Sequence, residues 1–135
     1  LSFMISSLRW KYFWLAMWIF GMGIGIYLSL MPTTPREQII PHLDKIIHGF
    51  SYALLAVFAA CIFEQKNAKY AALLWLVLLS GLIEFAQGYL TTTRSMEFAD
   101  FIANSIGIGI GTWLATKLNV LLFIERKMQF SHPRR

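Results

Sequence analysis

The chain has 135 residues, of which 57% are hydrophobic and only 14% are charged, and its formal net charge is +5. In soluble domains about a quarter of the residues are charged. This composition therefore excludes an ordinary soluble domain and indicates a membrane protein. The basic residues flank apolar runs instead of forming one patch on a folded surface, which disfavours a nucleic-acid-binding protein.

Four apolar runs follow one another along the chain, and each is long enough to cross a hydrocarbon core of about 30 Å. Within these runs the only charged or imidazole side chains are His48 in the second and Glu84 in the third. We expect the first run to be retained as a helix, because YLSLMPTTP at its end offers no A-x-A-like cleavage site. The sequence predicts an all-α integral membrane protein, a bundle of four transmembrane helices in one domain over 1–135, with helices at about 12–31, 44–63, 70–90 and 98–118.

The lysine and arginine residues lie mostly on one side of the predicted bundle. Nine of the twelve are on the side that holds both termini, and only Arg36, Lys45 and Arg94 are on the other. Basic residues near the ends of membrane spans stay in the cytoplasm. We therefore predict that both termini are cytoplasmic. Residues 118–125 either continue the fourth helix or lie in the inner membrane interface.

Polar side chains form one stripe along each of the last three predicted helices, as the helical period of 3.6 residues shows. On the second helix the stripe consists of Asp44, Lys45, His48 and Tyr52. On the third helix it consists of Ser80, Glu84, Gln87 and Thr91. On the fourth helix it consists of Glu97, Asp100 and Asn104, followed by the small residues Gly107, Gly111 and Ala115.

The three stripes are predicted to meet just below the outer membrane interface. An ionisable group at membrane depth is costly unless it is paired, neutral or hydrated, so we expect a shared cavity that opens outward. The small residues of the fourth helix predict close helix packing below this cavity. Gly21 and Gly25 form a GxxxG pair, which gives the first helix an expected scaffolding role.

Three segments between Asp44 and Gly111 carry a resemblance to a known family. DKIIHGFSYALLA, GLIEFAQGYL and TRSMEFADFIANSIGIGIG resemble, in order, the D-K-x-x-H, E-x-x-Q and R-x-x-x-x-x-D-x-x-x-N-x-x-G segments of the VanZ-like family. The first-described member of that family lowers susceptibility to the glycopeptide teicoplanin. The resemblance implies a multi-pass protein of the bacterial cytoplasmic membrane with a role in the cell envelope.

The residue types in the stripes suggest a site for an anionic lipid or a lipid-linked cell-wall precursor. In an enzymatic version, His48 with Asp44 or Glu84 would transfer a proton, since the imidazole titrates near neutral pH. The phosphate would be held by Lys45 and Arg94. The predicted ligand-binding residues are Lys45, Arg94, Gln87, Asp100, Asn104 and Tyr52.

Other functions remain open at this stage, including whether the ligand is modified or only bound. The acids and His48 include the donor types of a metal site, but no compact metal motif is present, so we predict neither a metal nor another cofactor. The main alternative is a non-enzymatic membrane adaptor that binds another envelope protein and whose polar cluster is structural. A proton-coupled transporter is disfavoured, because the polar stripes stop in the outer half of the bundle.

Overall fold

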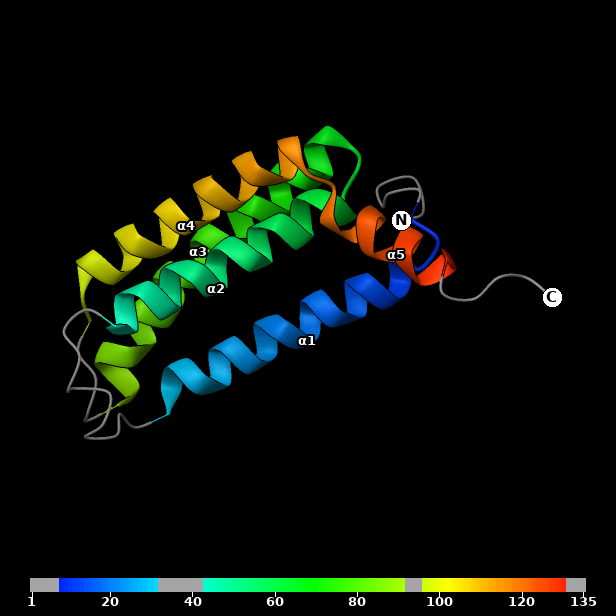
Figure 1. Cartoon of the computed structure of the whole chain (residues 1–135). Helices are drawn as coiled ribbons and strands as arrows, with labels where there is room; N and C mark the ends of the chain where they lie inside the picture. The colour runs from blue at the N-terminus through cyan, green and yellow to red at the C-terminus, as the bar shows by residue number, and fades with distance from the viewer. Residues whose placement is uncertain (1–7, 32–42, 92–95, 131–135) are drawn as a thin grey trace.

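A computed structural model describes residues 8–31, 43–91 and 96–130, and Figure 1 shows that these parts of the chain are helical. Its five helices are α1 (Lys11–Leu30), α2 (Leu43–Ile62), α3 (Lys66–Leu90), α4 (Phe98–Lys117) and α5 (Val120–Phe130). Helices α1 to α4 are long and apolar enough to cross a membrane. The prediction of an all-helical protein with four membrane-length helices is confirmed.

Helix α3 is longer than the sequence pattern predicts, because it begins at Lys66 and not near residue 70. Its N-cap residue Gln65 is extended, and the whole connection from α2 is therefore only three residues long, 63–65. The first turn of α3 contains Lys66, Asn67 and Lys69, so the apolar run on which the prediction rested begins only after this turn. Long lysine side chains can reach the membrane surface from a helical turn, so polarity did not end the helix.

The closest helix pair in the bundle is α2 with α4. A methyl group added at Gly107 would overlap the backbone carbonyl of Gly49, and one added at Gly111 would overlap that of Ala53. Backbone therefore lies directly on backbone at these two positions. The small-residue stripe of α4 has the close-packing role that its spacing predicts.

Helix α1 runs along one side of the other three membrane-length helices and contacts α2 and α3 (Figure 1). It is anchored by buried tryptophans, and Trp18 Nε1 donates a hydrogen bond to the carbonyl of Leu55 at 3.0 Å. Its GxxxG pair does not bring helices together. A methyl group at Gly21 would meet Leu55 at an ordinary 3.7 Å, and nothing lies within 4 Å of one at Gly25. Within the described residues this pair makes no backbone-to-backbone contact, and α1 is joined to α2 through the Trp18 side chain.

The segment after α4 forms a separate helix and does not continue α4. Leu118 is extended and interrupts the helical backbone. Asn119 then caps the next helix, because its Oδ1 accepts a hydrogen bond from the backbone N–H of Leu122 at 3.0 Å. Figure 1 shows that α5 lies beside the start of α1.

Candidate functional site

Charged side chains from α2, α3 and α4 meet at one end of the bundle, where α2 and α4 begin and α3 ends. We call this the polar end. Lys45 of α2 lies at its centre, with Nζ 2.6 Å from Glu97 Oε2 and 3.2 Å from Asp100 Oδ1. Asp44 and Asp100 lie in the first turns of α2 and α4, where the helix dipole favours a negative charge. One lysine thus joins α2 to the start of α4.

Glu97 is the N-cap residue of α4, and all of its polar groups contribute to this end of the bundle. Its carbonyl accepts the hydrogen bond from the Asp100 N–H that begins the helix. Its side chain makes no capping bond because it pairs with Lys45. Its backbone N–H points to Glu84 Oε2 at 3.4 Å. Our list of predicted site residues omitted Glu97, although its place on the polar stripe before Asp100 was a signal for it.

Glu84 is buried within α3, with 3% of its surface exposed. One carboxyl oxygen faces the Glu97 N–H, while Oε1 has no hydrogen-bond partner among the described residues. Tyr52 of α2 is also buried and is close enough to Glu84 for the two groups to interact electrostatically. The Glu84 carboxyl group therefore faces the space beside Lys45 and Glu97 with unused acceptor capacity.

Asn104 lies one turn after Asp100 on α4 and is only 1% exposed. Neither its Nδ2 nor its Oδ1 has a hydrogen-bond partner within 8–31, 43–91 and 96–130. Buried side-chain amides in folded proteins are nearly always hydrogen-bonded, so such a residue needs a water or a ligand. We define the polar cluster as Lys45, Glu84, Glu97, Asp100 and Asn104.

Other predicted site residues lie at the edge of this cluster or outside it. Gln87 donates from Nε2 to the carbonyl of Ser29 at 2.8 Å and so fastens α3 to the end of α1. His48 is half-buried on α2, and Asp44 is exposed but near enough to interact electrostatically with Lys45. Arg94 falls in 92–95, outside the described residues.

The polar cluster contains three carboxyl groups and one ammonium group, which suits it to more than one ligand. Among the residues that the structure describes, no group of three or more His, Cys, Asp or Glu side chains could hold a metal ion. The described side chains of this cluster are joined by ion pairs from Lys45 and by the contact of the Glu97 N–H with Glu84.

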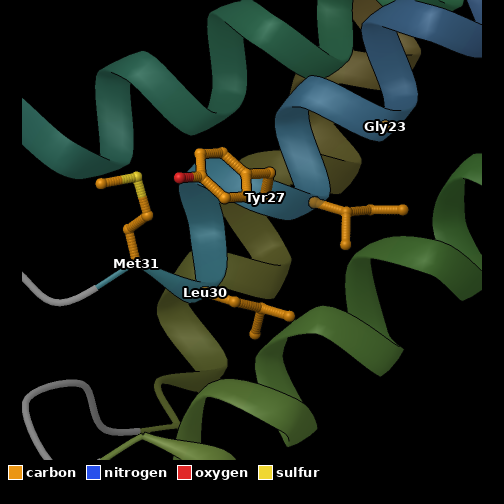
Figure 2. Close-up of a pocket in the computed structure, with 5 residues that line it drawn as sticks. Gly23, Tyr27, Leu30 and Met31 are labelled. Atoms are coloured by element: carbon orange, nitrogen blue, oxygen red, sulfur yellow. The ribbon is translucent and has the colours of Figure 1, made fainter.

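A groove of about 490 Å³ lies along the second half of α1 (Figure 2). Its lining comes from one face of the helix and consists of Gly23, Ile26, Tyr27, Leu30 and Met31. This lining has no charged side chain. Its last residues are next to Ser29, the residue to which Gln87 is bonded, so the groove reaches the polar end of the bundle.

A further buried carboxylate lies at the opposite end, and the sequence analysis missed it. Glu125 of α5 accepts hydrogen bonds from the N–H groups of Arg9 and Trp10 at 3.0 and 2.9 Å and from Trp14 Nε1 at 2.9 Å. It thereby caps the start of α1, where unpaired N–H groups favour an anion. We call this contact the Glu125 clamp. An acid on the apolar face of an amphipathic tail was its signal in the sequence.

Comparison with known families gives one match. The family model VanZ/LLP1 matches residues 6–124, so the chain belongs to the VanZ/LLP1 family. The matched range includes α1 to α4 and the first part of α5, beyond the three segments on which the resemblance was recognised. The comparisons with curated proteins and with solved structures give no significant match.

Proposed function

We propose that this VanZ/LLP1 protein is a cell-envelope protein of the bacterial cytoplasmic membrane and that its polar cluster binds the head group of an anionic lipid or a lipid-linked cell-wall precursor. The orientation follows from the basic residues. Both terminal segments and the first turn of α3 carry most of the lysine and arginine residues, which supports a cytoplasmic location for that end. The polar end then lies at the outer leaflet.

The observation that carries the proposal is the burial of polar groups without partners in the outer half of the bundle. Glu84 Oε1 and both polar atoms of Asn104 are buried and unpaired in the described structure. Such groups are costly at membrane depth, and they persist where a polar ligand or water enters. The apolar groove along α1 is a suitable place for the chain of a lipid whose head group lies at the polar end.

The cluster suggests how residues would act on the head group. Lys45 is paired with Glu97 and Asp100 at rest, and this ion pair opens so that Lys45 and Arg94 hold the phosphate. In an enzymatic version His48 transfers a proton together with Asp44 or Glu84, and Asn104 orients the reacting group. Gln87 serves chiefly as a link between helices, because its amide is bonded to Ser29. By family resemblance, the physiological effect is lowered susceptibility to teicoplanin.

A second candidate function is a non-enzymatic adaptor that binds another envelope protein. The observation in its favour is that Lys45 bridges α2 to both acids at the start of α4, as a purely structural cluster would. Thermal unfolding of the His48→Ala variant in detergent separates the two functions. A folded variant that has lost function indicates a site, whereas an unfolded variant indicates a structural cluster.

Native mass spectrometry of the purified protein with lipids retained tests the leading proposal. We expect the wild type to carry a phospholipid or a polyprenyl phosphate that is absent from the Lys45→Ala/Arg94→Ala variant. The matched control is Lys66→Ala/Lys69→Ala, which removes two positive charges at the opposite end of α3. Equal retention in both double variants, or no retained lipid in the wild type, would contradict head-group binding.

A further inference from the structure

The resting ion pairs restrict which head groups the polar cluster can accept. Lys45 is the partner of both Glu97 and Asp100, and Asp100 is buried. Among the described residues, a ligand that offered only a phosphate would take Lys45 away from both carboxylates and leave them without a cation. Of these three side chains Asp100 is the buried one, and a buried carboxylate that loses its cation is destabilising because its charge stays buried without compensation.

A ligand that carries charges of both signs avoids this cost. Its phosphate takes the place of the carboxylates on Lys45, and its cation takes the place of Lys45 on Glu97 and Asp100. Each protein charge then keeps an opposite partner, and the net charge of the cluster does not change. The exchange involves no covalent step, so only ion pairs are broken and formed.

The unpartnered polar atoms independently indicate what kind of cation fits. In the described parts of the chain Glu84 Oε1 is a buried acceptor without a donor, and the Asn104 amide offers a further acceptor and a donor. The Glu84 carboxyl group faces Glu97, with Oε2 3.4 Å from the Glu97 N–H, so Glu84 lies beside the carboxylates that the ligand would occupy. A primary ammonium group has three N–H donors and can satisfy them, whereas a quaternary ammonium group has none.

We infer that the head group bound at the polar cluster is zwitterionic, with a phosphate on Lys45 and a primary ammonium group on Glu97, Asp100 and Glu84. This inference rests on the proposed head-group site and specifies its ligand. The expected ligand class is an aminophospholipid of the outer leaflet.

Lipid exchange into nanodiscs tests this inference. Wild-type protein in nanodiscs is titrated with detergent-solubilised phosphatidylethanolamine, phosphatidylglycerol or phosphatidylcholine of the same acyl chains, and bound lipid is counted by native mass spectrometry. We expect phosphatidylethanolamine to bind at least about tenfold more tightly than either of the others. Equal affinities for phosphatidylethanolamine and phosphatidylcholine would overturn the inference, because the two head groups carry the same charges and choline has three methyl groups in place of the three N–H donors.

Variants separate this inference from the underlying proposal. Glu84→Gln and Asp100→Asn remove a negative charge with little change in shape, and each is expected to reduce the preference for phosphatidylethanolamine to about twofold or less. Glu64→Gln, an exposed carboxylate in the connection from α2 to α3, is the matched control and should keep the full preference. A thermal unfolding midpoint for each variant shows that it is folded.

The outcomes distinguish which idea fails. If phosphatidylglycerol binds best and Lys45→Met abolishes its binding, the head-group site stands and the zwitterionic ligand is wrong. If Lys45→Met and Asp100→Asn leave the binding of all three lipids unchanged, both the head-group site and its ligand are wrong.

Discussion

Each end of the bundle contains a buried glutamate, and the two glutamates differ in how many hydrogen bonds they accept. Glu125 is 6% exposed and accepts three hydrogen bonds from N–H groups at the start of α1. Glu84 is buried to a similar degree, but among the residues that the structure describes it has one long contact, to the Glu97 N–H, and one oxygen without a partner. A carboxylate whose two oxygens both accept hydrogen bonds from the protein stabilises the fold. An acid with an unused oxygen has capacity left for a ligand.

The largest expected effect comes from changing the helix contact that assembles the polar end. Gly107→Leu places a side chain where the carbonyl of Gly49 lies, so α2 and α4 must separate and Lys45 must leave Asp100. We expect a loss of about 4 kcal/mol or more in the free energy of unfolding, beyond the usual range for overpacking, because backbone and not a flexible side chain is in the way. Unfolding in mixed micelles measures it.

The neighbouring glycine on α4 provides the control for this prediction. Nothing lies within 4 Å of a methyl group added at Gly109. Gly109→Ala should therefore leave stability unchanged or raise it by up to about 1 kcal/mol through helix propensity. Similar stability of Gly107→Leu and Gly109→Ala would show that α2 and α4 do not pack through their backbones.

The next largest effect is expected at the Glu125 clamp. Glu125→Ala leaves two backbone N–H groups and the Trp14 indole N–H without their acceptor, and we expect it to cost about 3 kcal/mol of stability. Lipid binding by the folded fraction should not change, because the clamp lies at the other end of the bundle. The measurements are chemical unfolding and lipid retention, with Glu64→Ala as the exposed control. A loss of lipid binding without a loss of stability would show that Glu125 belongs to the binding site and not to the fold.

The smallest effect on stability, with the opposite sign, is expected in the polar cluster. Asn104→Leu has nearly the same shape but removes two unpaired polar atoms from a buried position. Replacing an unsatisfied buried polar group by an apolar one of equal shape is neutral or favourable, so we expect stability to rise by up to about 1 kcal/mol while lipid retention falls. Thermal unfolding and native mass spectrometry are read on the same sample. A loss of stability would show that Asn104 serves the fold.

Much of the architecture could be predicted from the sequence, because it depends on local properties. Uninterrupted apolar runs fix the number of membrane-length helices, since a segment that cannot hydrogen-bond to lipid must satisfy its own backbone. The spacing of Gly107 and Gly111 predicts close packing, because only small residues let two backbones approach. The segments that carry the family resemblance also lie within the range of the family match.

Other features depended on partners far apart in the chain, which no local pattern specifies. The GxxxG pair of α1 has the spacing of a packing motif, but within the described residues the hydrogen bond between α1 and α2 comes from Trp18 to Leu55 and not from the glycines. Asp100 and Glu97 could each have paired with several cations, and only the position of α2 against α4 brings both to Lys45.

The sequence by itself determined that this protein has four membrane-length helices, that polar stripes run along three of them, and that it belongs to the VanZ/LLP1 family. The tertiary structure decided which polar groups are satisfied. Glu84 and Glu125 are alike as residues, but α1 and the two residues before it supply three donors to Glu125, while within the described residues only the Glu97 N–H reaches Glu84. Apolarity and helical period are properties of neighbouring residues, whereas the satisfaction of a buried polar atom depends on which helix packs against it.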